Sequence, residues 1–443
     1  MRSIFTSSRV LWLLILIGSS LALSGCGRDY TSRMNNVLAA MDQGDTHTAL
    51  DEINALIDRG EKNKKPERNS LTLLMLERGT IELASGNLAR AAEDFSQADQ
   101  MLEMLDLTPQ GARNVAAAMF SGNSVVYHAP LYEKLMVNMV SLATYLANNQ
   151  PSAAAVEARR LVVLIQYFND AGYEAHPALS LAHALAGYAL ANVGEANTAR
   201  KLYEAAIAID GSPFATESLR RLRGGKDPDG KESAVVLVLS GQGPTRVPKA
   251  IPIGVMMGWL TSDFPLSSNE TKILGGFSAE QMLSVIRFPV METADVRYTQ
   301  WIARTNAGGQ RVLALASDTN QFAEEQWREM RPAIAMNAIS RWLTRHIAQT
   351  ALGKTGEAVG GVGGGILRLA GLATKGAMMA ADIPDTRAWN TIPGALHIGY
   401  ASIEAGESTV SVYGSGPGGK TRIDVPVNVK EGRPAFVLVY SVH

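Results

Sequence analysis

A glycine-rich stretch near the carboxyl end of the chain matches the pattern of a phosphate-binding loop. Residues 414–421 read GSGPGGKT, which fits G-x-x-x-x-G-K-[ST]. In such a loop the lysine and the serine or threonine begin a helix, and the first backbone N–H groups of this helix bind the phosphates. Here the next residues read RIDVPVNV, and their β-branched side chains and proline favour a strand. We therefore interpret residues 414–421 as a hairpin loop and expect no nucleotide to bind.

Cys26 is the only cysteine in the 443-residue chain, and it stands where a thiol could accept a lipid. Two arginines and an apolar run over residues 10–23 precede Ser24 and Gly25, which lead into the cysteine. This order is that of a secretory signal, and the run is too short for a membrane-spanning helix. The pattern resembles a bacterial lipobox, which implies cleavage before Cys26, a diacylglycerol on its thiol and a further acyl chain such as palmitate. An ordinary cleaved signal with a chance cysteine is the alternative.

The residue after Cys26 and the overall charge narrow the expected location and partners. Gly27 stands where an aspartate would retain an enterobacterial lipoprotein at the inner membrane, so the resemblance implies the outer membrane, facing the periplasm. Sorting rules differ among bacteria, and display on the cell surface remains an alternative. Lysine and arginine number 41 against 42 acidic residues, so no overall field attracts nucleic acid. With Cys26 lipidated, no thiol is left for a disulfide or a metal site.

Other residue types that could do chemistry do not form a recognisable constellation. His176 and His183 would share a helix face, but no carboxylate joins them at ligand spacing. The chain has no Gly-x-Ser-x-Gly elbow, and Glu324 and Glu325 fall on a helix face that we expect to be solvated. The glycine cluster at 360–365 lacks the preceding strand of a dinucleotide loop. We therefore expect no catalytic site, no metal and no cofactor.

Two segments of the first half repeat one pattern of small and large residues at identical offsets. The positions are Gly79, Gly86, Ala91, Phe95 and Ala98 in one segment, and Gly187, Gly194, Ala199, Tyr203 and Ala206 in the other. The offsets coincide with those of the tetratricopeptide repeat, a helix-turn-helix unit. A small residue lets two helices cross closely, a glycine permits the tight turn, and the aromatic ring fills the gap. A generic helical bundle is the alternative.

Weaker copies of the pattern extend the prediction to four helical pairs between residues 31 and 222. Gly44 and Ala49 mark one copy, and Asn149 and Ala154 mark another. A longer loop over residues 107–123 interrupts the spacing. Stacked repeats leave a concave surface that typically receives a peptide or a helix of another protein. This surface is the main functional indication in the first half.

The pattern changes after residues 223–233, which are charged, rich in glycine and predicted to form a linker. Pro332 is predicted to open an amphipathic helix. The apolar segment 366–379 is predicted to pack in the core, with a membrane or a partner as the alternative. The last three predicted strands would form an antiparallel meander. Strands are predicted at residues 234–239, 283–288, 295–304, 311–316, 395–401, 408–413, 423–429 and 435–442.

These elements predict an α+β multidomain protein in which all-α, tetratricopeptide-like repeats precede a mixed, β-rich domain. We assign residues 1–25 to the lipoprotein signal, 26–222 to the repeats, 223–233 to the linker and 234–443 to the C-terminal domain.

One short motif carries a family resemblance. Asp385, Arg387, Trp389 and Pro393 are spaced as Asp-x-Arg-x-Trp-x-x-x-Pro. With the lipobox and the repeats, the motif resembles a family of uncharacterised bacterial tetratricopeptide lipoproteins. The resemblance implies an association with penicillin-binding-protein activator lipoproteins and a role in envelope assembly. From the residues themselves, we expect Asp385 or Arg387 to tie a loop and Trp389 to anchor it in the core, with a ligand site as the alternative.

The sequence therefore favours a non-enzymatic, lipid-anchored envelope protein whose repeats bind a partner protein and scaffold or regulate an envelope complex. One alternative is a structural subunit of a secretion or surface-appendage machine. Another is an envelope hydrolase whose catalytic residues are dispersed along the chain.

Overall fold

Helices make up the first half of the chain and most strands lie in the second half, which confirms the predicted mixture of the two. The signal with Cys26, the loop at 107–123, the glycine cluster at 360–365 and the segment 366–379 lie outside the described residues. The computed structural model describes residues 30–64, 67–103, 127, 129–170, 172–173, 175–225, 231–263, 277–294, 296–358, 384–432 and 434–442.

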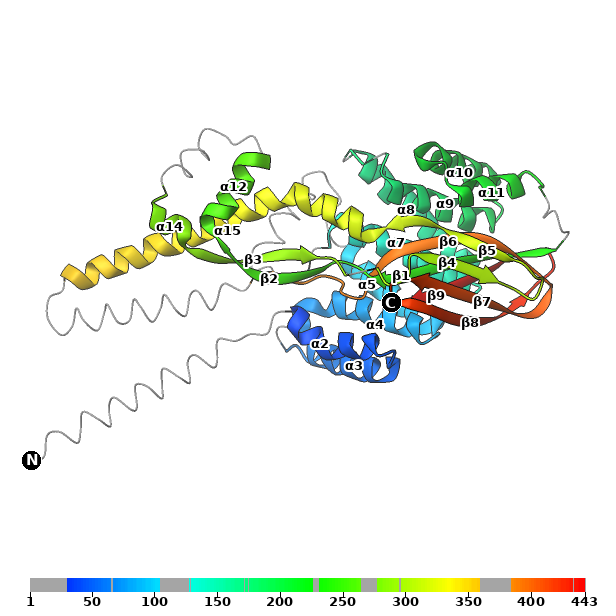
Figure 1. Ribbon diagram of the computed structural model, residues 1–443, viewed down its shortest axis with the longest axis horizontal. Helices are drawn as coiled ribbons and strands as arrows, with labels where there is room; N and C mark the ends of the chain where they lie inside the picture. Colours follow the sequence, from blue (N-terminus) through cyan, green and yellow to red (C-terminus); the bar gives the residue numbers. More distant parts are fainter. Residues whose placement is uncertain are drawn as a thin grey trace, which may run out of the picture.

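The helices of the first half pack as successive pairs, each joined by a short turn (Figure 1). The turns contain Gly44, Gly86, Asn149 and Gly194, and all four residues have a positive φ, between 54° and 85°. Glycine adopts this left-handed conformation without strain and asparagine tolerates it, which explains the residue types at the turns. The helices are α2 (Tyr30–Asp42), α3 (Thr46–Glu61), η1 (Glu67–Ser70), α4 (Leu71–Ala84), α5 (Leu88–Glu103), α7 (Leu131–Ala147), α8 (Pro151–Asp170), α9 (Pro177–Ala191), α10 (Ala196–Asp210) and α11 (Pro213–Leu222).

Two of the pairs cross at the small residues that the sequence pattern singles out. A Cβ atom on Gly79 would lie 2.9 Å from the ring of Phe95, and one on Gly187 would lie 2.9 Å from the ring of Tyr203. The helices therefore approach so closely that the aromatic ring occupies the space of the missing side chain. The alanines of the pattern lie in the same interfaces and are fully buried: Ala91, Ala98, Ala199 and Ala206.

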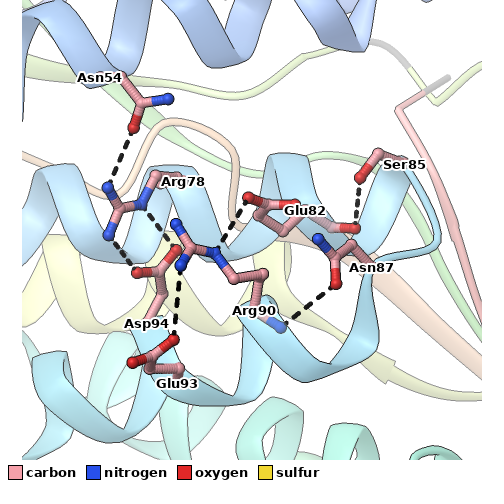
Figure 2. A network of polar contacts seen from close by, with 8 residues as sticks. All are labelled: Asn54, Arg78, Glu82, Ser85, Asn87, Arg90, Glu93 and Asp94. Atoms are coloured by element: carbon pink, nitrogen blue, oxygen red, sulfur yellow. Dashed lines mark hydrogen bonds and ion pairs between the residues drawn. The ribbon is translucent and has the colours of Figure 1, made fainter.

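A charged network ties neighbouring pairs together near the start of the helical layer (Figure 2). Arg78 of α4 donates from Nε and Nη2 to the carboxylate of Asp94 in α5, at 2.9 and 2.5 Å. Its Nη1 donates to the side-chain oxygen of Asn54 in α3, at 3.0 Å. The hydrogen bonds with Asp94 raise the pKa of Arg78. One planar guanidinium thus links three helices. A lysine could not form the same contacts, because its side chain has only one nitrogen.

A seven-stranded, nearly closed sheet forms the second layer, with the order β8-β7-β4-β5-β6-β1-β9. β1 is buried on both faces of the sheet. Its side chains alternate, with Val235 and Leu237 on one face and Val236 and Val238 on the other. The first pair of side chains joins the core of the helical layer, and the second pair joins a core inside the curved sheet. The strands are β1 (Glu232–Gln242), β4 (Gln300–Arg304), β5 (Gln310–Asp318), β6 (Pro393–Ile403), β7 (Gly406–Gly416), β8 (Gly419–Val429) and β9 (Ala435–Ser441).

The predicted meander of the last three strands is wrong. β7 and β8 do form an antiparallel hairpin, with Gly416 paired to Gly419, so the 414–421 pattern lies on this hairpin. β9, however, pairs with β1 in parallel, from Ala234 with Ala435 to Ser240 with Ser441. The buried backbone of β1 needs hydrogen-bond partners on both edges, and β9 supplies the second edge.

An arm projects from the body on one side (Figure 1). It consists of the hairpin of β2 (Thr245–Pro252) and β3 (Val285–Glu292), the short helices α12 (Ile253–Asp263) and α14 (Ala279–Leu283), and the long helix α15 (Thr319–Ala358). The arm has an apolar core of its own, in which Phe288 of β3, Trp327 and Ile339 of α15 and Met256 of α12 are buried. This core stabilises a hairpin that would be marginal alone.

The prediction that Pro332 opens a helix is also wrong, because Pro332 lies inside the 40-residue α15. The helix begins at Thr319, where the side chain of Asp318 accepts a hydrogen bond from the N–H of Gln321 at 3.0 Å. Pro332 removes one backbone hydrogen bond from the middle of the helix, and α15 bends partway along its length (Figure 1). Packing on both sides of the proline maintains the helix, with Trp327 and Ile334 in the same core.

Candidate functional site

The segment before β6 runs through the interface between the helical layer and the sheet. Trp389 is fully buried there, and its ring centroid lies 5.9 Å from that of Phe95. Its indole Nε1 donates to the hydroxyl of Thr80 in α4, at 3.1 Å. The motif tryptophan therefore packs against the same aromatic residue that fills the gap at Gly79.

Glu77 of α4 binds the backbone on the carboxyl side of Trp389. Its fully buried carboxylate accepts hydrogen bonds from the N–H of Asn390 at 2.7 Å and from the N–H and hydroxyl of Thr391 at 2.9 and 2.6 Å. The hydroxyl of Tyr30 donates to it at 3.2 Å. Burial raises the pKa of Glu77 to about 7, although the hydrogen bonds from Thr391 and Asn390 favour the charged form.

Glu133 of α7 binds the other side of the same segment. Its carboxylate accepts hydrogen bonds from the hydroxyls of Tyr127 and Tyr132 and, at 3.4 Å, from the N–H of Trp389. Burial raises the pKa of Glu133 as well. Arg246 of β2 is buried nearby, and its Nη1 donates to the carbonyl oxygen of Arg387 at 3.0 Å. Its positive charge lies close enough to Glu133 to interact electrostatically.

The charged residues of the motif close a loop. Arg387 donates from Nε and Nη2 to the carboxylate of Asp385, at 2.9 and 2.6 Å, and from Nη1 to the carbonyl oxygen of Asn69 at 2.9 Å. Pro393 is the first residue of β6. We call Glu77, Glu133, Asp385, Arg387 and Trp389 the clasp. Since its carboxylates bind backbone and side-chain donors inside the protein, this arrangement favours a structural role for the motif.

An open cleft lies on another side of the same interface, between α11 and the strands β5 and β6. It has a volume of about 430 Å³. Tyr400 of β6 forms one wall, stacked on Phe214 of α11 with 5.4 Å between ring centroids. Burial raises the pKa of Tyr400 to about 12, so its hydroxyl remains a neutral donor and acceptor, 3.0 Å from the hydroxyl of Ser218.

Three arginines and one glutamate line this cleft. Glu217 accepts hydrogen bonds from Arg220 at 2.6 Å and from Arg221 at 2.7 Å, which lowers the pKa of Glu217. The guanidinium of Arg221 also lies over the ring of Tyr400, 4.4 Å from its centroid. Arg311 of β5 is exposed and belongs to the lining residues on the sheet side of the cleft. Three positive charges against one negative charge make the cleft cationic, with an aromatic wall. We call it the arginine cleft.

The structure brings together residues that the sequence analysis did not connect. Glu324 is exposed, as expected, and Glu325 is partly exposed, with its carboxylate 3.1 Å from Nε2 of His176 at the start of α9. His397 is buried in β6, and burial lowers its pKa to about 4. The described residues contain no group of three potential metal ligands and no helix long and apolar enough to cross a membrane.

Glu77, Glu133 and Arg246 were missed by the sequence analysis, although the two glutamates had a signal. Each lies within a largely apolar helix, LTLLMLERGTIELA for α4 and LYEKLMVNMVSLATYLA for α7. A carboxylate on a buried face must find hydrogen-bond donors, and among the described donors to the two glutamates only Tyr132, a donor to Glu133, lies on the same helix as its acceptor. Arg246 had no such signal, because β2 was not predicted as a strand.

Comparison of the chain with protein-family models, with curated proteins and with solved structures finds no match in any of the three.

Proposed function

We propose that this protein is a non-enzymatic, lipid-anchored protein of the bacterial outer membrane, facing the periplasm, that binds a partner protein and scaffolds an envelope complex. Cys26 carries the lipid. The helical pairs act as tetratricopeptide-like repeats, a proposal supported by their common turn conformation and by the ring of Phe95 or Tyr203 against a helical glycine.

In the described residues, the protein's own sheet packs against the inner side of the helical layer, where such repeats often have a free groove. Side chains of β1 and β6, together with Trp389 and Ile392, belong to the same apolar core as the helices. The clasp then adds hydrogen bonds that the N–H groups of Asn390 and Trp389 donate to Glu77 and Glu133. In this proposal the protein's own sheet therefore occupies the position of a bound ligand, and the partner binds where the two layers meet at the surface.

The arginine cleft is the observation that carries the proposal. It is open, cationic and partly aromatic, so it complements an acidic segment that also presents an apolar or aromatic side chain. Arg311 supplies a charge on the β5 wall, and Arg221 is already held in place by Glu217, Ser233 and the ring of Tyr400. A preorganised arginine loses less conformational entropy on binding than a free one.

Site-specific crosslinking in cells tests this assignment. A photoreactive residue at Val312, which is 62 % exposed and lines the cleft, should capture the partner, whereas the same residue at Val156 of α8, which is 49 % exposed, should not. Arg311→Glu should abolish capture at Val312, and Arg311→Lys should retain most of it. Equal capture at both positions, or capture that does not respond to reversal of the Arg311 charge, would contradict the proposal.

The lipid anchor has its own test. After a salt wash of the membranes, the Cys26→Ser variant should be in the soluble fraction instead of the membrane fraction, because it lacks the acyl groups that give stable anchoring. Retention of this variant at wild-type levels after washing would show that Cys26 is not the anchor.

A further inference from the structure

Four large apolar side chains are exposed together at the outer end of the β2–β3 hairpin. Leu283 is 76 % exposed, and Val255, Val285 and Met282 are exposed beside it. The backbone places them close to one another, since Pro252 pairs with Val285 and the N–H of Ile253 donates to the carbonyl oxygen of Ser284 at 2.9 Å. We call Val255, Met282, Leu283 and Val285 the arm patch.

Among the described residues, the two short helices beside the arm patch carry few charges, and an exposed arginine, Arg287, lies two positions from Val285 on the same face of β3. Helix α12 reads IGVMMGWLTSD, with its only charged residue at the far end, and α14 reads AEQML, with Glu280 as its only charge. Trp259 of α12 is half-buried and packs against Phe288, 5.7 Å between ring centroids. An apolar patch next to a partly exposed tryptophan is typical of a surface that meets the interface of a membrane.

The start of the described chain lies at the base of the same hairpin. The hydroxyl of Thr31, near the beginning of α2, donates to the carbonyl oxygen of Arg246 in β2 at 2.9 Å. Only four peptide units separate Cys26 from Tyr30. Four extended residues reach at most about 14 Å, so a lipidated Cys26 would hold the start of α2 within about that distance of the lipid headgroups.

The arm is longer than this tether. The seven residues from Arg246 to Pro252 span roughly 20 Å as a strand. The 40-residue α15 adds a rod of roughly 60 Å beside the hairpin. Figure 1 shows the arm and the start of α2 at the same end of the body. A membrane within reach of Cys26 would therefore also be within reach of the arm patch.

We propose that the arm lies against the membrane that holds the lipid anchor, and that the arm patch inserts into its headgroup region. This inference rests on the lipid anchor of the proposed function, but not on the arginine cleft. The arm patch thus binds a lipid surface. The experiment must distinguish this from binding of a protein to the arm patch.

The test uses the lipidated protein reconstituted into protein-free vesicles of phosphatidylethanolamine and phosphatidylglycerol. Leu283→Cys introduces a free thiol, because the native cysteine is acylated, and an environment-sensitive fluorophore is attached to it. Val163→Cys, at a valine of α8 that is 62 % exposed, is the matched control. The probe at residue 283 should shift its emission to shorter wavelengths and be quenched by brominated lipids, and the probe at residue 163 should do neither. Identical spectra at the two positions would overturn the inference, as would shielding of residue 283 that occurs only in native membranes containing other proteins.

A second measurement does not depend on the anchor. The chain beginning at Gly27, which lacks the acylated cysteine, should co-sediment weakly with the same vesicles. The double substitution Leu283→Glu and Val285→Glu should reduce this partitioning about tenfold or more, and Val163→Glu should leave it unchanged. No effect of the double substitution would overturn the inference even if Cys26→Ser had confirmed the anchor. Conversely, loss of partitioning would support the arm even if crosslinking at the arginine cleft failed.

Discussion

Glu77 accepts hydrogen bonds from both the backbone N–H and the hydroxyl of Thr391, although 314 positions separate the two residues in the chain. These two bonds join α4, in the second helical pair, to the segment that precedes β6. The hydroxyl of Tyr30 in α2, in the first pair, donates to the same carboxylate. One buried carboxyl group thus links two helical pairs to the segment that leads into the sheet, in addition to the contacts of Glu133 and Arg387. Several consequences of this connection can be measured.

Removing the Glu77 carboxylate should destabilise the whole fold. Glu77→Ala leaves the N–H groups of Asn390 and Thr391 buried without their acceptor, which should cost about 2–4 kcal/mol in the free energy of unfolding. Chemical denaturation followed by circular dichroism measures this cost. Glu93→Ala is the control, because the side chain of Glu93 is exposed and forms only a surface ion pair with Arg90. A cost for Glu77→Ala no greater than that for Glu93→Ala would contradict this role.

Glu77 should also make stability depend on pH. Burial raises its pKa in the folded protein to about 7, from an ordinary value of 4.5. Between these values the folded state binds more protons than the unfolded state, so the free energy of unfolding should fall as the pH rises through this window. The contribution of this single group should be roughly 3 kcal/mol across the window.

Glu77→Gln should flatten this pH dependence, because glutamine keeps an acceptor oxygen but does not titrate. Denaturation midpoints at about pH 5 and about pH 7.5 should therefore differ less in the variant than in the wild-type protein. Glu133 remains in both proteins, so the difference between their pH profiles isolates Glu77. Parallel profiles would show that Glu77 does not titrate in this window.

Trp389 should contribute through both its ring and its indole N–H. Trp389→Ala should cost about 3–5 kcal/mol, because it opens a cavity against Phe95 in the core. Trp389→Phe keeps most of the apolar contact but loses the hydrogen bond to Thr80, so it should cost less than the alanine variant. Thermal unfolding of the two variants checks this order. Equal destabilisation by the two substitutions would show that the ring contact does not matter.

The sequence predicts well what is local. The glycine and aromatic positions of the helical pairs repeat at fixed offsets because each pair folds on itself, and Gly79 with Phe95 or Gly187 with Tyr203 meet within one pair. The apolar, β-branched runs likewise predict where most strands lie, including β1 and β9. In both cases the residue pattern reflects packing within one helical pair or the burial of one strand, so it can be read from a short segment of the chain.

The contacts that join the layers depend on pairing across the chain, which periodicity does not encode. The parallel pairing of β9 with β1 and the bonds from Glu77 to Thr391 connect residues that no local pattern relates. The buried glutamates indicate only that donors must exist somewhere. At Pro332 a local pattern is misleading. Proline favours the first turn of a helix, but the apolar core of the arm maintains α15 on both sides of Pro332.

The two crossing glycines offer the sharpest test of the helical pairs. Gly79→Ala places a Cβ atom 2.9 Å from the ring of Phe95, and this crowding should cost about 1–3 kcal/mol despite the better helix propensity of alanine. Gly187→Ala should behave in the same way against Tyr203, which tests whether the two pairs are packed alike.

A control and a compensating variant separate crowding from helix propensity. Gly258 lies in α12, and among the described residues none outside this helix has an atom within 4 Å of the position of its Cβ, so Gly258→Ala should be neutral or stabilising by about 0.5–1 kcal/mol. Phe95→Leu should remove much of the penalty of Gly79→Ala, because the smaller side chain leaves space for the new methyl group. The double variant should therefore be more stable than the sum of the two single effects predicts. Strict additivity would mean that Gly79 is required for a reason other than its contact with Phe95, and the close crossing would no longer explain why glycine occupies this position in both pairs.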